Sequence, residues 1–259
     1  MIVVGSAFQP RNTKNPLTFA ERESLIVAAY PEEAGSLPVS LRRIKIVGVM
    51  DYPYDDNAWV SSVQKAVDRV KTGKKTGLIG HSKDSSSFYL KIFPDWRNHV
   101  EVDNVDGINA TDIRHAIYEG SAKPIYDLMP KPSVKVLEKI WSDHNDFRDL
   151  EQEYNDIIDY RESWKKAPFP PTFVTTDAVL TQSGYILLIK RGNFPYKGCW
   201  ALPGGYLEMD ISIEDNMVKE LHEETRVKVP AKVLKGSIKN RAVFDHPERD
   251  PRGRTITHS

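Results

Sequence analysis

Short apolar runs alternate with amphipathic segments along the first part of the chain. Apolar runs of strand length occupy residues 1–5, 43–49, 75–80 and 99–102. Residues 18–30 and 57–70 instead space their apolar side chains three or four positions apart, as a helix does. Strands that alternate with helices are typical of a parallel sheet, so this pattern predicts an α/β layer.

The pattern changes at residues 133–164, which keep helical spacing but carry many charged side chains. Residues 166–171, Lys-Ala-Pro-Phe-Pro-Pro, then interrupt the helix, because consecutive prolines continue neither a helix nor a strand. We therefore expect two domains, at residues 1–165 and 166–259.

The second domain opens with a pattern typical of strands. Residues 172–181 and 185–190 are rich in β-branched and aromatic residues, and Gln182-Ser-Gly184 between them favours a turn. The sequence therefore predicts a β-hairpin. Residues 254–259 predict one more strand.

Composition and charge restrict the class of protein. The 40% hydrophobic and 28% charged residues are typical of a globular protein. Lys and Arg balance Asp and Glu at 36 each, and no apolar run approaches the roughly 18–20 residues of a membrane span. A single cysteine, Cys199, excludes an intrachain disulfide and fits a reducing cytosol. We expect a cytoplasmic protein without a nucleic-acid or membrane partner, and leave a homo-oligomer open.

A glycine loop and an acidic helix follow the hairpin. Ser212, with Asp215 three positions later, is typical of a helix start, so we expect the helix to begin near Ile213. At about 100° per residue, three glutamates fall within one arc of the helix: Glu220, Glu223 and Glu224. An apolar set occupies the adjacent arc and is available to pack on a sheet: Met217, Val218 and Leu221.

Three carboxylates on one helix face repel each other, at about 0.2–0.5 kcal/mol per pair. A hard cation such as Mg²⁺ or Mn²⁺ would relieve this repulsion and bind diphosphate oxygens. Gly204 and Gly205 let the backbone approach the helix and the metal. A solvated acidic face is the alternative for these glutamates alone, but the neighbouring glycines and the capped helix favour a metal site.

The segment from Gly205 to Val227 resembles the Nudix box, although Ile211, Lys219 and Arg226 stand where that pattern has Glu, Arg and Gly. The resemblance implies a Nudix α/β/α sandwich at residues 166–259, incomplete at its C-terminus. It also implies a diphosphate hydrolase that uses Mg²⁺ or Mn²⁺. The carboxylates carried over are catalytic and metal-binding: Glu220, Glu223 and Glu224, with Glu208 as a further metal residue.

Residues 245–258 resemble the HPxRxxRGRxIT segment of ADP-ribose pyrophosphatases. This implies hydrolysis of ADP-ribose to AMP and ribose 5-phosphate. The expected substrate-binding residues are Arg191, Gly204, Gly205, Arg249, Arg252 and Arg254. Surface arginines on a polar turn are the alternative. A Nudix hydrolase of another nucleoside diphosphate derivative, and a non-catalytic ADP-ribose sensor, also stay open.

Five groups of residues in the first half lie in a recognisable order: Gly5-Ser-Ala, Asn15-Pro-Leu-Thr18 with Glu21-Arg22, Asp51 with Asn57 and Trp59, Gly80-His-Ser-Lys-Asp-Ser-Ser86 and Ile108-Asn-Ala-Thr-Asp-Ile-Arg114. They resemble nicotinamide mononucleotide (NMN) adenylyltransferases of the nucleotidyltransferase α/β-phosphodiesterase superfamily that are fused to a Nudix domain. The resemblance implies a Rossmann-like parallel sheet with ATP and NMN as substrates. The implied substrate-binding residues are Asn57, Trp59, Gly80, His81, Lys83, Asp84, Thr111 and Arg114. For Trp59, the alternative to stacking on nicotinamide is a core aromatic.

The family's GxFxPxHxGH motif, whose histidines bind the transferred phosphates, does not occur in this sequence. We therefore expect the chain to begin at the family's second strand, with the first strand of the sheet missing, and to be truncated at both ends. Adenylyl transfer is then expected of the full-length parent and not of this chain.

Overall fold

The computed structural model describes residues 1–31, 43–71, 73, 75–80, 91–93, 96, 98–103, 107, 109–121, 126–143 and 146–259. The chain forms two compact units, Met1–Glu151 and Gln152–Ser259. The division falls inside helix α6 (Asp146–Trp164), whereas the sequence places a domain boundary after that helix. The boundary at residue 165 therefore stays a prediction.

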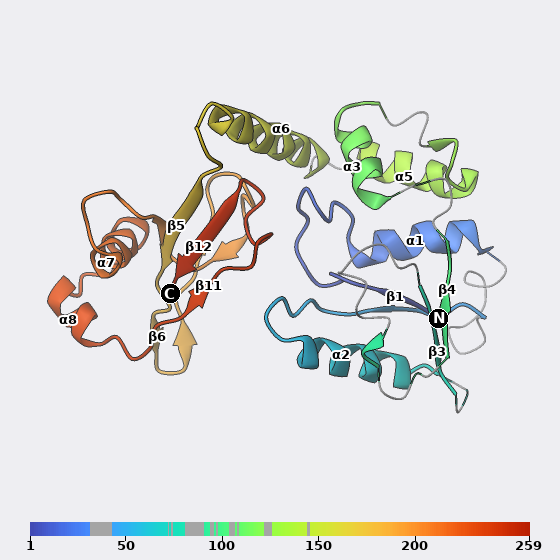
Figure 1. The fold of residues 1–259 in the computed structure, drawn as a ribbon, viewed down its shortest axis with the longest axis horizontal. Helices are drawn as coiled ribbons and strands as arrows, with labels where there is room; N and C mark the ends of the chain where they lie inside the picture. The colour runs from blue at the N-terminus through green and yellow to red at the C-terminus, as the bar shows by residue number, and fades with distance from the viewer. Residues whose placement is uncertain are drawn as a thin grey trace. The chain divides into compact units, whose positions relative to one another are not determined.

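Parallel strand pairs form the sheet structure of the first unit (Figure 1). Strand β1 (Ile2–Val4) pairs with β2 (Ile46–Gly48), and β3 (Gly77–Gly80) pairs with β4 (Asn98–Glu101). Each strand lies within one or two residues of an apolar run in the sequence. The expected parallel α/β arrangement is confirmed.

Helices supply the crossovers that parallel strands require. Helix α1 (Phe19–Ala29) lies between β1 and β2 in the chain, and α2 (Asp56–Asp68) lies between β2 and β3. Thr18 caps α1 with a capping box, because its side chain accepts from the Glu21 amide and its own amide donates to the Glu21 carboxylate at 2.8 Å. An apolar cluster packs beneath α2: Val49, Val63, Val67, Phe93 and Trp96.

Among the described residues, further helices follow at α3 (Ala110–Tyr118), α5 (Lys131–Asp143) and α6. Helix α5 packs on α1, where the Ser133 hydroxyl donates to the Leu25 carbonyl at 2.8 Å. None of the helices in the described part of the chain has the length and apolar character needed to cross a membrane.

The second unit contains a four-stranded sheet in the order β10-β5-β12-β11. Its strands are β5 (Thr172–Asp177), β10 (Gly204–Tyr206), β11 (Val243–Phe244) and β12 (Arg254–His258). The central pair, β5 and β12, is parallel, and the Thr175 and Thr257 hydroxyls lie 2.6 Å apart across it. Strand β10 runs antiparallel to β5, with Gly204 opposite Asp177.

Two short hairpins and two helices complete this unit. The strands are β6 (Thr181–Gln182) with β7 (Tyr185–Ile186), and β8 (Ile189–Lys190) with β9 (Trp200–Ala201). Ser183 and Gly184 both have positive φ, at 50° and 81°, as the two central residues of a type I′ hairpin turn do. The expected turn is therefore confirmed, but the hairpin is shorter than predicted, because Thr172–Asp177 form β5, which pairs with β10 and β12 and not with residues 185–190. The helices are α7 (Ile213–Glu224) and α8 (Ala231–Gly236).

Candidate functional site

Helix α7 begins where its sequence predicts. The Ser212 hydroxyl accepts a hydrogen bond from the Asp215 amide at 3.2 Å, which satisfies one of the free amides at the helix start. Val218 and Leu221 are buried against Ala178 and Leu234, and α7 lies against β5 and β10 (Figure 1). Burial of the apolar arc thus determines the direction in which the glutamate face of the helix points.

The two glycines of β10 bring this strand into contact with the helix. A Cβ atom on Gly205 would lie 2.4 Å from Glu220 Oε1, and one on Gly204 would lie 2.1 Å from the Thr176 carbonyl oxygen. The Gly204 amide also donates to Glu224 Oε2 at 2.8 Å. Only glycine fits at either position without displacing a neighbour.

The carboxylates of α7 repel one another across a partly buried space. Burial raises the pKa of Glu220 above its ordinary value, and the charges of Glu224 and Glu223 raise it further. Lys219 opposes this effect: its ammonium pairs with Glu208 and lies 3.7 Å from Glu223. The lysine that replaces the box arginine thus contacts two of the predicted metal residues.

The donor chemistry of these carboxylates fits a hard divalent cation. Among the residues that the structure describes, no three His, Cys, Asp or Glu side chains form a preassembled cation cluster. Glu208 is held by Lys219, and Glu224 accepts from the Gly204 amide. A bound cation would compete with these contacts. The positive charge of Lys219 also acts on Glu220, where it opposes the rise in pKa that burial and the like charges cause.

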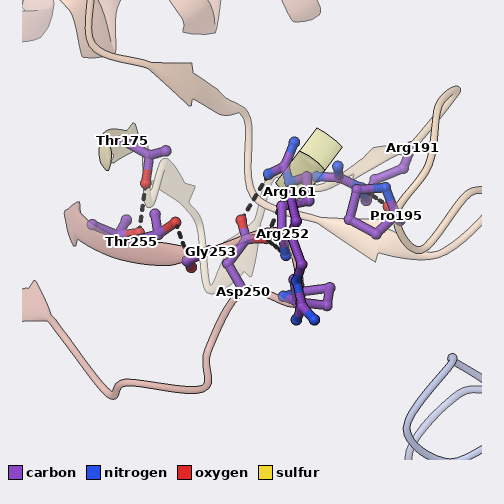
Figure 2. A network of polar contacts seen from close by, with 10 residues as sticks. Arg161, Thr175, Arg191, Pro195, Asp250, Arg252, Gly253 and Thr255 are labelled. Carbon is purple, nitrogen blue, oxygen red and sulfur yellow. Dashed lines mark hydrogen bonds and ion pairs between the residues drawn. The ribbon is translucent and has the colours of Figure 1, made fainter. Parts of the chain in front are cut away.

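The arginines expected to bind substrate are held by neighbouring groups. Arg252 donates through Nε and Nη2 to the Asp250 carboxylate at 3.0 and 2.7 Å, and its guanidinium lies 5.0 Å from the centre of the Tyr206 ring (Figure 2). Arg191 Nε donates to the Pro195 carbonyl at 2.8 Å, and Arg254 donates to the Asp245 carbonyl. These contacts fix the orientation of each guanidinium.

Asp177 is a partly buried carboxylate that sequence reasoning missed. Burial raises its pKa, the nearby Arg249 and Arg191 lower it, and Glu224 raises it. Asp177 therefore lies within electrostatic reach of two expected substrate arginines and of one box glutamate. Asp177 could have been placed near the site only from the strand register, which pairs it with Gly204.

A cavity of about 360 Å³ opens beside Arg252. Its walls come from α6 and from the segment after β8: Asp156, Ile157, Tyr160, Gly192, Asn193, Phe194, Pro195, Lys197 and Arg252. Edge-to-face and tilted ring contacts run from Tyr160 through Phe173 to Tyr206, the residue after Gly205. Arg161, also in α6, donates through Nε to the Pro251 carbonyl at 2.9 Å (Figure 2). The contribution of α6 was not expected from the sequence.

The predicted residues of the first unit lie on three elements. Asn57 and Trp59 are in the first turn of α2, and the Trp59 ring packs 5.9 Å from that of Phe93. Gly80 ends β3. His81, Lys83 and Asp84 lie outside the described residues.

Thr111 and Arg114 come together at the start of α3. Arg114 Nη2 donates to the Thr111 hydroxyl at 3.1 Å. Burial lowers the pKa of the Arg114 guanidinium.

Comparison with known proteins matches both parts of the chain. The NUDIX domain family model covers residues 171–259. A nicotinamide/nicotinic acid mononucleotide adenylyltransferase of Acinetobacter baylyi is 36% identical over 156 residues, which are 60% of this chain and 77% of that protein. An ADP-ribose pyrophosphatase of Methanocaldococcus jannaschii is 40% identical over 101 residues, which are 39% of this chain and 56% of that protein.

Solved structures also match both parts at once. One of them is a bifunctional NMN adenylyltransferase/ADP-ribose pyrophosphatase from Francisella tularensis, complexed with AMP and a Mn ion. The likeness has a TM-score of 0.83 and 33% identity, and covers 99% of this chain and 74% of that one. These relatives associate the chain with NAD metabolism. The chain belongs to the family of bifunctional NMN adenylyltransferases/ADP-ribose pyrophosphatases and carries a Nudix domain at residues 171–259.

Proposed function

We propose that the second unit hydrolyses ADP-ribose to AMP and ribose 5-phosphate with Mg²⁺ or Mn²⁺. The observation that carries this proposal is the contact of β10 with the acidic face of α7, where Gly205 leaves room for the Glu220 carboxylate. The partly buried carboxylates next to this contact repel one another. A site that gathers negative charge in this way is suited to a divalent cation.

In this proposal Glu220, Glu223 and Glu224 hold the cation, with Glu208 as a further carboxylate. The chemistry that the cation supplies is the polarisation of the phosphoryl oxygens and the activation of water. Lys219 keeps Glu208 and Glu223 on the same side of the helix through its two ion pairs. The Gly204 amide fixes the orientation of Glu224.

In this proposal, the charged groups around Asp177 orient an anionic substrate. The charges of Arg191 and Arg249 act on this carboxylate, as does that of Glu224, so both guanidinium groups lie in its surroundings. Two such groups suit the four non-bridging oxygens of a diphosphate ester, because guanidinium binds phosphate with paired, charge-assisted hydrogen bonds. The negative charge of Asp177 attracts both guanidinium groups when substrate is absent.

The cavity beside Arg252 accommodates the end of the substrate that is distant from the bond broken. Its volume of about 360 Å³ falls in the usual range for small-molecule sites, about 300–1,000 Å³. Tyr160 and Phe194 supply aromatic surface, and Lys197 and Arg252 supply positive charge. Aromatic and cationic groups together suit a nucleoside that is joined to phosphate.

For the first unit we propose binding of ATP and NMN. Transfer of AMP to NMN, giving NAD and diphosphate, is proposed for a polypeptide that also carries the HxGH motif. Asn57, Trp59, Gly80, His81, Lys83, Asp84, Thr111 and Arg114 are the proposed substrate residues. The pairing of Arg114 with Thr111 near the start of α3 supports this proposal, since a hydroxyl and a guanidinium group beside a helix N-terminus suit a phosphate.

Chromatography tests the proposed hydrolase activity, because it separates ADP-ribose and other candidate substrates from their products. With Mn²⁺, the chain is expected to convert ADP-ribose to AMP and ribose 5-phosphate, and Glu223→Gln to lose at least about 100-fold in kcat. Lys232→Gln, a change outside the carboxylate site, is the matched control and should keep wild-type turnover. Faster turnover of a dinucleotide would replace the proposed substrate, and tight binding of ADP-ribose without turnover would support a sensor.

A further inference from the structure

Asn216, the fourth residue of α7, is a completely buried polar residue with no exposed surface. Its Nδ2 donates to the Thr176 hydroxyl at 2.8 Å and to the Tyr206 carbonyl at 3.2 Å. Its Oδ1 accepts from the Glu208 amide at 3.1 Å. Both donor hydrogens and one acceptor of the amide are therefore used, each by a different element.

These three hydrogen bonds join the parts that carry the proposed metal residues. Thr176 belongs to β5, Tyr206 ends β10, and Glu208 lies in the segment between β10 and α7. Asn216 precedes Glu220 by four residues, so the two side chains lie one above the other on the same face of the helix. A change in the position of Asn216 is thus transmitted to Glu220.

The apolar neighbours of Asn216 do not fix the position of α7 in the same way. Val218 and Leu221 stabilise the packing of α7 by burying apolar surface. This stabilisation depends on the area buried and only a little on direction. Hydrogen bonds depend on direction, and those of Asn216 fix the height and the rotation of α7 relative to β10. A buried amide is unfavourable unless it is fully paired, so its presence in this core indicates a requirement for directional contacts.

We propose that Asn216 is a positioning residue of the hydrolase site. It sets the position of Glu220 opposite Gly205 and holds the backbone of Glu208 against α7, so that both carboxylates face one cation. The inference rests on the proposed function, because it gives Asn216 a role only through these carboxylates. Asn216 itself touches neither the cation nor the substrate.

Binding of Mn²⁺ alone, measured by calorimetry on the full chain, tests the role without any substrate. Asn216→Ala keeps a good helix former at the position, and we expect the Mn²⁺ dissociation constant to rise about tenfold or more. In turnover, kcat should fall while the KM for ADP-ribose changes little, since the arginines and the cavity are not altered. Val218→Ala is the matched control: it removes buried volume from the same helix and should lower the melting temperature with unchanged Mn²⁺ affinity.

Thr176→Val provides a second variant, which keeps the shape of the core and removes one partner of Asn216. We expect a severalfold weaker Mn²⁺ affinity, and this variant decides the question if Asn216→Ala does not fold. Wild-type Mn²⁺ affinity in the folded variants, together with wild-type turnover, would overturn the positioning role and leave the proposed hydrolase intact. Absence of Mn²⁺ binding and of turnover in the unmodified chain would instead overturn both proposals.

Discussion

Gly204 and Gly205 are neighbours in β10, but a methyl group added at each would meet a different kind of obstacle. At Gly205 the nearest atoms are those of the Glu220 carboxylate, with Oε1 at 2.4 Å. At Gly204 they are the Thr176 carbonyl oxygen at 2.1 Å, Asp177 Oδ1 at 2.5 Å and Asp177 Cα at 2.9 Å, so two of the three belong to the backbone. A carboxylate at the end of a flexible side chain moves at little cost, whereas the backbone of a central strand does not.

We therefore expect Gly205→Ala to keep its stability and lose its activity. Ordinary contacts begin at 3.4 Å, so the Glu220 carboxylate has to move by about 1 Å, and a misplacement of about 1 Å costs about 100-fold in rate. Gly204→Ala is expected to lose about 1–3 kcal/mol of folding free energy, as overpacked cores do. The two variants differ by one position, so each serves as the control for the other.

The assay combines thermal melting by circular dichroism with Mn²⁺-dependent release of AMP from ADP-ribose. The expected pattern is a melting temperature close to wild type and a low kcat for Gly205→Ala, and a clear fall in melting temperature for Gly204→Ala. A Gly205→Ala protein with wild-type kcat and wild-type Mn²⁺ dependence would refute the reasoning. It would mean that the position of Glu220 opposite β10 has no part in the reaction.

Three further predictions follow from burial and charge. Because burial and like charges raise the folded-state pKa of Glu220, its protonated form favours the fold. That stability is present below the unfolded pKa and is lost as pH rises through the folded pKa. Glu220→Gln should therefore melt a few degrees higher than wild type at neutral pH in EDTA, and the difference should shrink in acid; equal melting curves at neutral pH would contradict this. Arg252→Ala should raise the KM for ADP-ribose about tenfold or more, as loss of a charged hydrogen bond does; an unchanged KM in steady-state kinetics would remove Arg252 from the substrate site. Ser212→Ala should cost about 1 kcal/mol in urea unfolding through loss of the helix cap; an unchanged midpoint would show that the cap is dispensable.

Local signals in the sequence were sufficient for much of the fold. Ser212 with Asp215 marks the start of α7, and Ser183 with Gly184 marks the hairpin turn. Each signal involves residues within a few positions, where helix caps and turns are determined by short-range sterics and hydrogen bonds. The spacing of the three glutamates likewise follows from helix geometry alone.

The residues that sequence reasoning missed depend on contacts between distant segments. Asp177 reaches the site because β5 and β10 pair in the register that places it opposite Gly204. Asn216 is indistinguishable in sequence from a solvated helix residue until Thr176 and Tyr206 are placed beside it. Helix periodicity also does not show that Tyr160 of α6 lines a cavity with Arg252. Register and tertiary packing are long-range properties, which local propensity does not encode.

Phosphorus NMR follows the metal-dependent hydrolysis of ADP-ribose directly, because diphosphate and phosphomonoester phosphorus give separate resonances. With Mg²⁺ added to the chain, the two diphosphate resonances should disappear together as two phosphomonoester resonances appear, those of AMP and ribose 5-phosphate. EDTA should stop the change, and added Mg²⁺ should restore it. Diphosphate resonances that persist at high enzyme concentration, both with Mg²⁺ and after incubation with Mn²⁺ that is chelated before the spectrum is recorded, would contradict metal-dependent hydrolysis.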